Sequence, residues 1–263
     1  MAITLTQGIM LALVAFICGM DYAWEAFFIF RPIVVAFFAG IVLNDVQLGL
    51  AAGAITELAY MGLLTIGGNV PPNPLVAGMM TVVIAHTTGA SPEAALGLSL
   101  PFALLMQWIT IFYNSSFAGF LHPLDRMAEN AETKRFMRLV LMGTVIVGAT
   151  YAVVVFLSAY AMQRPIQAFV ESFPVWLVHG FEVAGGILPG VGLALLLRSM
   201  LNINNAPYLV FGFVMATFMN LNGILPVALV AAGMALLGYL RDVKAAKAGN
   251  QVIQQGGGEH EGI

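Results

Sequence analysis

The stretch from Leu139 to Met162 contains 24 residues without a formal charge. A helix of about 20 mostly apolar residues is long enough to cross the hydrocarbon core of a bilayer. Over all 263 residues, 60% are hydrophobic and 9% are charged, whereas soluble domains carry about 25% charged residues. A chain so poor in charge cannot cover a water-facing surface. The sequence therefore predicts an integral, polytopic membrane protein of the all-α class.

Other apolar runs differ in length. Ala94 to Leu121 forms a second run of membrane-spanning length, with Pro101 as a point where it can bend. The runs Pro32 to Asn44 and Val46 to Thr56 contain only 13 and 11 residues between charged positions. Runs of that length suit re-entrant hairpins better than full spans, provided that protein or a water-filled cavity covers the turn.

The C-terminal half shows the same pattern of interrupted apolar runs. A glycine-rich run that begins near Glu182 is interrupted by "NINNAP" and later by "NLNGILP". Glu182 stands near the start of this run, as Glu57 stands in the earlier one. We therefore expect two loosely related halves, and interrupted segments in corresponding positions point to a transporter's binding site.

The basic residues predict the orientation. Seven of the ten lie in two places, the segment 122–138 and the tail after Leu240. Because cytoplasmic loops carry an excess of Lys and Arg, both places should face the cytoplasm. We expect residues 1–240 to form the membrane-embedded domain. The polar, glycine-rich residues 241–263 should form a disordered cytoplasmic tail.

Glu57 is the most informative polar residue, because a charge near the bilayer centre costs about 2.5–3.5 kcal/mol. It can be a structural carboxylate that accepts hydrogen bonds from backbone donors at a hairpin turn. Alternatively, it can accept hydrogen bonds from the hydroxyls of a polar solute. Asn69 and Asn73 flank a proline pair in the following turn, and their amides can both donate and accept.

Further polar residues are weaker candidates. Asp21 and Glu25 would share one helix face and are predicted to pair with Arg31 at the membrane interface, with Glu25 as an alternative ligand contact. Gln107, deep in an apolar run, is either a helix–helix tie or a ligand contact. Asn220 and Asn222 lie at a break of the second half and are assigned to the binding site.

Several function classes find no support. The chain lacks the usual hydrolase, phosphate-loop and zinc-protease motifs, and it has no basic stripe for nucleic acid. A single cysteine, Cys18, excludes an internal disulfide and a cysteine-based zinc site. His86 and His179 lack metal-ligand spacing. We expect neither an enzyme nor a bound cofactor or metal.

The motifs together resemble those of the IIC component of the mannose–fructose–sorbose family of the bacterial sugar phosphotransferase system. The resemblance runs from the first helix to Leu240. Within the family, the chain looks most similar to the hexosamine and N-acetylgalactosamine branch. The most specific matching pieces are Arg31-Pro32, "GIVLND" ending at Asp45, Glu57 followed by Ile66-Gly67, Ala184-Gly185-Gly186, and Asn220-x-Asn222.

The resemblance implies a sugar permease of the bacterial inner membrane. It would work with a IID membrane subunit, as a trimer of heterodimers with an elevator-like core. A separate IIB component, fed by IIA, would phosphorylate the sugar, so that neither His86 nor His179 carries phosphate. Two alternatives stay open, an ion-coupled sugar transporter in which Glu57 carries a proton and a non-transporting membrane scaffold.

Overall fold

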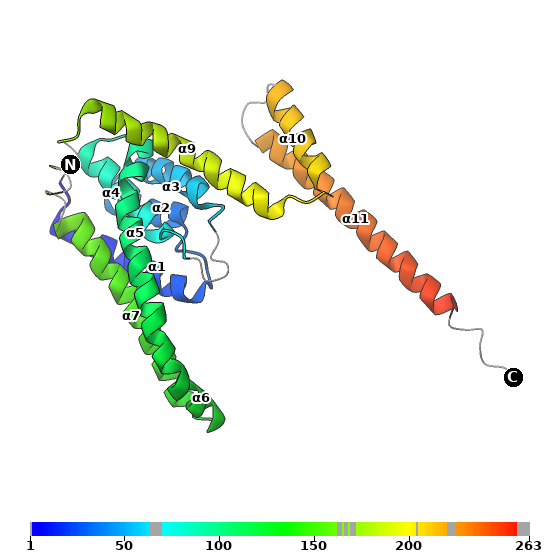
Figure 1. The fold of residues 1–263 in the computed structure, drawn as a ribbon, viewed down its shortest axis with the longest axis horizontal. Coiled ribbons are helices and arrows are strands. Elements are labelled where there is room, and N and C mark those ends of the chain that lie inside the picture. The colour runs from blue at the N-terminus through cyan, green and yellow to red at the C-terminus, as the bar shows by residue number, and fades with distance from the viewer. Residues whose placement is uncertain are drawn as a thin grey trace. The chain divides into compact units, whose positions relative to one another are not determined.

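The regular structure of the described residues is entirely helical. The computed structural model describes residues 2–63, 70–161, 165, 168, 172–203, 205–219 and 225–256. Its elements are, in chain order (Figure 1), α1 (Leu5–Trp24), α2 (Pro32–Val42), α3 (Val46–Tyr60), α4 (Pro74–Thr88), α5 (Pro92–Phe117), η1 (Ala118–Phe120), α6 (Leu121–Glu129), α7 (Thr133–Phe156), η2 (Leu157–Ala161), α9 (Val175–Met200), α10 (Ala206–Phe218) and α11 (Leu225–Gly256). The chain divides into two compact units, Met1–Ser199 and Met200–Ile263, which we call unit 1 and unit 2.

Four helical segments of the described chain are long and apolar enough to cross a membrane. They are Leu5–Trp24, Pro92–Glu129, Thr133–Ala161 and Val175–Met200. Pro92–Glu129 contains the predicted run from Ala94 to Leu121, and Thr133–Ala161 contains the described part of the run that begins at Leu139. This confirms the prediction of an all-helical chain with membrane-length helices. Pro101 lies inside α5.

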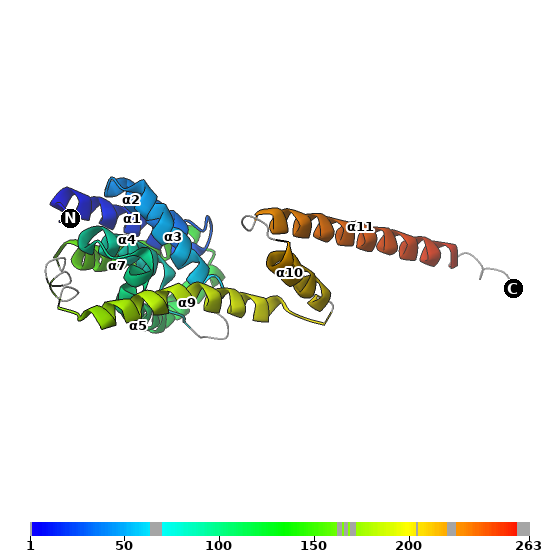
Figure 2. The ribbon, with the colours of Figure 1, turned by 90° about the horizontal axis from the view of Figure 1, so that it is seen from above.

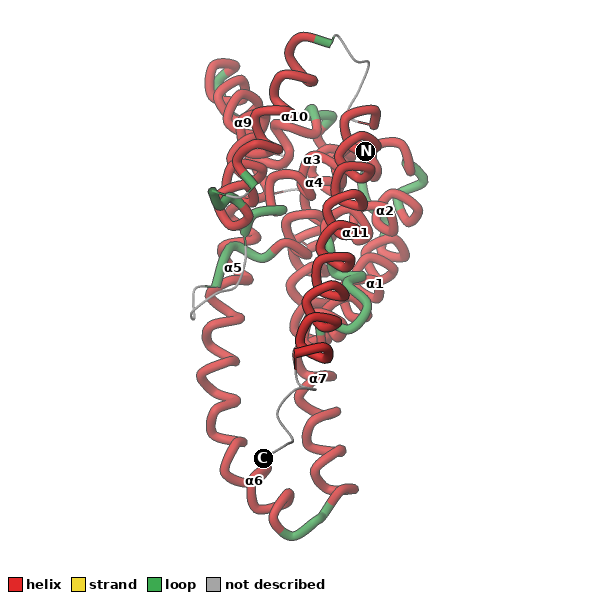
Figure 3. The backbone as a smooth tube through the Cα atoms, turned by 90° about the vertical axis from the view of Figure 1, so that its right-hand side faces the viewer, coloured by secondary structure: helices red, strands yellow, loops and turns green. Residues whose placement is uncertain are grey.

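The basic segment 122–138 is more ordered than a connecting loop. α6 ends at Glu129 and α7 begins at Thr133, so that only a short turn separates them. Figure 3 shows α5, α6 and α7 as one long helical hairpin. The segment is rich in Ala, Leu, Met, Glu, Lys and Arg, which are strong helix formers. Helix propensity therefore extends both membrane helices through the charged residues.

The short helix α4 lies at the centre of unit 1. Twelve of its 15 residues are buried, and it packs against α1, α2, α3, α5 and α7. A helix that is apolar on all sides belongs in a protein core. Three buried hydroxyls link it to its neighbours, because Thr81 Oγ1 lies 3.3 Å from Thr56 Oγ1 on α3 and 3.2 Å from Ser99 Oγ on α5.

The two short apolar runs form a tightly packed helix pair, α2 and α3, seen beside α4 in Figure 2. Asn44 adopts a positive φ of 59° in the turn between them, and Asp45 caps α3 by accepting from Leu48 N at 3.0 Å. A Cβ placed on Gly49 would lie 2.7 Å from the Ala36 carbonyl oxygen and 2.8 Å from the Gly40 Cα. Glycine at this crossing is therefore required for the two backbones to approach.

Helix α9 approaches the rest of unit 1 through glycines. A Cβ on Gly185 would collide with the backbone of Glu93 at the start of α5, and one on Gly192 would collide with the Leu58 carbonyl at the end of α3. Small residues at such crossings let membrane helices come close together. The Ala184-Gly185-Gly186 run thus has a packing role in the fold.

Unit 2 contains the second polar break. α9 ends at Met200 and α10 begins at Ala206. Asn202 Oδ1 accepts from Asn205 N at 3.0 Å, as expected for an asparagine turn. α11 continues to Gly256, whereas the polar composition predicts disorder from residue 241. The alanines and lysines that follow Leu240 favour helix, and a preceding helical turn removes the unfavourable nucleation step.

Candidate functional site

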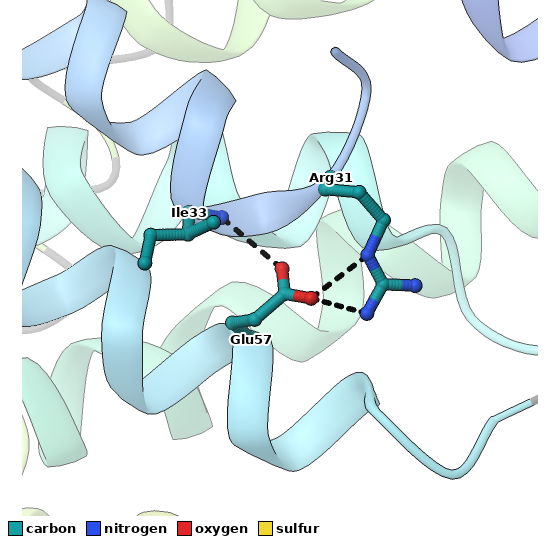
Figure 4. Close-up of polar contacts among 3 residues, drawn as sticks. All are labelled: Arg31, Ile33 and Glu57. Atoms are coloured by element: carbon teal, nitrogen blue, oxygen red, sulfur yellow. Dashed lines mark hydrogen bonds and ion pairs between the residues drawn. The ribbon is translucent and has the colours of Figure 1, made fainter. Parts of the chain in front are cut away.

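Glu57 forms an ion pair with Arg31 (Figure 4). Arg31 Nε donates to Glu57 Oε1 at 2.8 Å, and Arg31 Nη2 donates to the same oxygen. Glu57 Oε2 accepts from the backbone N of Ile33 at 3.3 Å, in the first turn of α2. A carboxylate is favourable at a helix N-terminus, where backbone N–H groups have no intrahelical partner. The pair therefore joins the last turn of α3 to the start of α2.

This pairing corrects the predicted partnership of Arg31 with Asp21 and Glu25. Asp21 is buried and accepts from Phe27 N at 2.8 Å and from Ile29 N at 2.7 Å. α1 ends at Trp24, and Glu25 is its exposed C-cap residue with a φ of 48°. The two carboxylates therefore do not share a helix face. Asp21 instead satisfies backbone donors of the chain that leaves the helix.

One feature of the sequence indicates the Arg31–Glu57 pair, although the spacing between the two residues does not. Arg31 is the only Lys or Arg among the first 125 residues. A carboxylate inside an apolar unit needs a partner, and this one cation was available to it. Both side chains remain partly accessible, with exposed fractions of 29% for Arg31 and 17% for Glu57.

Asn73 is held by bonds to three helices. Its Oδ1 accepts from Val76 N at 3.1 Å, and its Nδ2 donates to the Tyr151 hydroxyl on α7 at 2.5 Å. Its backbone N donates to Ala103 O on α5 at 3.1 Å. The side chain is 1% exposed, and both of its amide atoms are engaged. Asn73 is therefore a buried N-cap whose contact with a ligand would require a rearrangement.

Gln107 fixes the chain just before Asn73. Its Nε2 donates to the Val70 carbonyl oxygen. The structure thus brings Gln107 and Asn73 together at the 70–73 segment, as ties between this segment and the surrounding helices. Glu57 belongs to a different polar group, that of Arg31 and Ile33. Asn69, Asn220 and Asn222 lie outside the described residues.

A cavity of about 470 Å³ lies among α1, α5, α6 and α7. Of the predicted site residues, Glu25 lines it. Its polar wall also includes Thr110, Tyr113 and Asn114 of α5, which the sequence reading did not select. Their spacing of three and four positions places them on one helix face, and this pattern could have identified them. Tyr113 donates to Thr110 Oγ1 at 3.2 Å.

The histidines in the described part of the chain show no metal-binding arrangement. His179 Nδ1 lies 3.4 Å from Glu182 Oε2, one helical turn away. Among the described residues, no group of three or more His, Cys, Asp or Glu side chains could hold a metal ion.

Comparison with known proteins decides the family. The family described as "PTS system sorbose-specific IIC component" matches residues 5–237. The chain belongs to this family. It is accordingly a IIC sugar permease component of a bacterial phosphotransferase system, a multi-pass membrane protein and a transport subunit that does not itself catalyse phosphoryl transfer.

Individual relatives agree with this assignment. The chain is 48% identical over 234 residues to "N-acetylgalactosamine permease IIC component 1" of Escherichia coli (strain K12), covering 89% of this IIC chain and 88% of the relative. It is 28% identical to the mannose-specific EIIC component of the same strain, with 90% and 89% covered. The sorbose-specific EIIC component of Lacticaseibacillus casei is 26% identical, with 84% and 80% covered.

Two solved structures share the fold. One, described as a membrane protein, has a TM-score of 0.78 and 28% identity, with 91% of this IIC chain and 96% of the other chain covered. The other is a chain in a cryo-EM structure of the mannose transporter ManYZ with microcin E492. It has a TM-score of 0.58 and 26% identity, with 92% and 97% covered.

Proposed function

We propose that this IIC subunit binds N-acetylgalactosamine or galactosamine and moves it across the bacterial inner membrane. The observation that carries the proposal is the 48% identity, over 89% of the chain, to a relative named as an N-acetylgalactosamine permease component. Identity to the mannose and sorbose relatives is 28% and 26%. The amino sugar is therefore the favoured substrate among the named hexoses.

We propose a membrane arrangement in which the α2–α3 pair is a re-entrant hairpin. Each of these helices, with 11 and 15 residues, is shorter than the roughly 20 residues needed for a full span. Residues 1–240 form the membrane domain, with two loosely related halves. The basic turn at Lys134 and the tail after Leu240 face the cytoplasm, in keeping with the positions of Lys and Arg.

The proposed partner in the membrane is a IID subunit. A relative of this fold is part of the transporter named ManYZ, and much of α9 and unit 2 exposes large apolar side chains in the isolated chain. We infer a trimer of IIC–IID heterodimers with an elevator-like core. Cytoplasmic IIB, fed by IIA, phosphorylates the delivered sugar.

The proposed sugar contacts are polar residues of the two interrupted segments, together with one residue at the end of α1 and one on α5. They are Glu57, Asn69, Asn73, Gln107, Glu25, Asn220 and Asn222. Glu57 is the central one, because its carboxylate is partly accessible and accepts hydrogen bonds from donors. A sugar hydroxyl that reaches Glu57 must share the carboxylate with Arg31 or displace it. Sugar binding would then loosen the tie between α2 and α3, which is a route to coupling with movement.

Calorimetry on the purified IIC–IID complex tests the substrate. N-acetylgalactosamine should bind more tightly than mannose or sorbose. Tighter binding of mannose would overturn the substrate assignment. Uptake into proteoliposomes should require phosphorylated IIB. Uptake driven by a pH gradient without IIA and IIB would support the ion-coupled alternative, and a complex that binds none of these sugars would support the scaffold.

A further inference from the structure

The cavity among α1, α5, α6 and α7 is an apolar cleft over most of its length. Phe117, Phe120 and Leu121 line one side, and Leu139, Ile146 and Val147 line the other. α5–α6 and α7 belong to the two longest candidate membrane spans of the described residues, Pro92–Glu129 and Thr133–Ala161. An apolar cavity does not hold water stably. The apolar part of this cleft therefore suits hydrocarbon or another apolar chain better than water.

A basic pocket lies at the end of the same helical hairpin. It has a volume of about 360 Å³ and is lined by His122, Pro123, Arg126, Met127, Asn130, Glu132 and Arg135. Arg135 Nη1 donates to Glu132 Oε2 at 2.8 Å. Among the described residues, Arg126 has no ion-pair partner. Two arginines and one glutamate leave this pocket with one net positive charge, counting histidine as neutral.

Four further charged residues, two basic and two acidic, lie near the turn between α6 and α7. Lys134 and Arg138 lie at the start of α7, and Asp125 and Glu129 lie on α6. Neither of these two acidic residues lines the basic pocket or the cleft. At its other end the cleft is lined by Glu25, which would repel an anion. An anionic group therefore belongs at the α6 end.

Helix α6 connects the two pockets. Leu121 and Leu124 line the cleft, whereas His122, Arg126 and Met127 line the basic pocket. Figure 3 shows α6 at the closed end of the hairpin. An apolar wall and a cationic wall thus meet on one nine-residue helix. A ligand that fits both has an apolar chain and an anionic head.

We propose that this hairpin binds an anionic phospholipid. An acyl chain occupies the cleft between α5 and α7, and the phosphate accepts hydrogen bonds from Arg126 and Arg135. Arg guanidinium groups bind phosphate through paired N–H donors, and basic pockets beside membrane helices bind anionic head groups. A helix of a neighbouring subunit would also fit the cleft, but it would have to bring an anionic group of its own to pair with Arg126.

Two variants test the two walls. The double variant Arg126→Gln, Arg135→Gln removes the cationic wall. Its control is the double variant Arg198→Gln, Arg241→Gln, which removes the same number of positive charges outside the basic pocket. Gly143→Leu fills the cleft, because Gly143 lines it and a Cβ there meets nothing within 4 Å. Its control is Gly119→Leu on the same hairpin, where a Cβ is equally free and which lies outside both linings.

Native mass spectrometry of the IIC–IID complex measures the lipid that it retains. After incubation with phosphatidylglycerol, the unaltered complex should keep it in preference to phosphatidylcholine. The paired arginine variant should bind phosphatidylglycerol roughly thirty-fold more weakly, and Gly143→Leu should lose it, while both controls keep it. Inorganic phosphate alone should not compete, which separates a lipid from a free anion.

Three results would overturn the proposal. They are equal retention of phosphatidylcholine by the unaltered complex, unchanged phosphatidylglycerol in Gly143→Leu, and cross-linking of a cysteine placed at position 143 to the IID subunit. The first comparison needs no variant and stays decisive if the arginine variant fails to assemble. None of these readouts depends on which sugar the permease carries.

Discussion

A hydrogen bond joins Asn73 to Tyr151, which lies 78 positions later in the sequence: Asn73 Nδ2 donates to the Tyr151 hydroxyl at 2.5 Å. Tyr151 is fully buried on α7, and Asn73 is the N-cap residue of α4, the helix at the centre of unit 1. The bond therefore ties the central short helix to one of the membrane-length helices. It also satisfies an amide that would otherwise be buried without an acceptor.

Tyr151→Phe should destabilise the folded subunit. The substitution keeps the ring but leaves the Asn73 amide unpaired, which costs about 1–3 kcal/mol. We expect a lower melting temperature of the purified complex in detergent. The control is Tyr239→Phe, because the Tyr239 side chain is well exposed. An unchanged melting temperature for Tyr151→Phe would show that this bond contributes little.

Arg31 and Glu57 should be energetically coupled. Arg31→Gln and Glu57→Gln each leave one member of a partly buried pair without its partner, while the double variant leaves two neutral side chains that can still bond. The double variant should therefore lose less stability than the sum of the single variants, by about 0.5–3 kcal/mol. Denaturation of all four proteins under the same conditions measures this difference. Additive losses would contradict the coupling.

Glu57→Gln should also weaken sugar binding if the carboxylate contacts the substrate. A bond to a charged group contributes about 1.5–3 kcal/mol, against about 1 kcal/mol for a neutral one. The loss corresponds to roughly ten-fold lower affinity, and Glu57→Ala should lower it further. Calorimetry gives the affinity, and the yield of purified complex gives the effect on assembly. Reduced yield with unchanged affinity would assign Glu57 a structural role alone.

Gly49→Ala should destabilise the α2–α3 pair although alanine favours helix by about 1 kcal/mol over glycine. The added Cβ would lie 2.7 Å from the Ala36 carbonyl oxygen and 2.8 Å from the Gly40 Cα, so the helices must separate. Gly186→Ala is the matched control, because a Cβ there meets nothing within 4 Å. Thermal unfolding should show a lower melting temperature for Gly49→Ala than for the control. The reverse order would refute the close crossing.

The orientation can be tested by labelling single cysteines. Lys134→Cys and Lys247→Cys should resist a membrane-impermeant reagent added to intact cells, because both positions are expected to face the cytoplasm. Labelling should appear after the cells are permeabilised. The native Cys18 is buried and gives little background. Labelling of either position in intact cells would reverse the proposed topology.

The sequence by itself determined the class of this protein and the family to which it belongs. Low charge and long apolar runs leave few folds other than membrane helices, because lipid offers no partner for exposed polar groups. The same local patterns placed the two short runs that became α2 and α3. These features are readable because they depend on residues close together in the chain.

Only the tertiary structure decided how the polar residues are paired. Arg31 bonds to Glu57, 26 positions away, and not to the nearer Asp21 or Glu25. The sequence predicts that Gln107 needs a partner and places Asn73 in a sugar site. The hydrogen-bond partners that the structure gives them, Tyr151 for Asn73 and the Val70 carbonyl for Gln107, lie on segments that sequence spacing does not connect. Inside an apolar core a polar group bonds to whichever complementary group the packing brings within reach. That choice depends on the arrangement of whole helices.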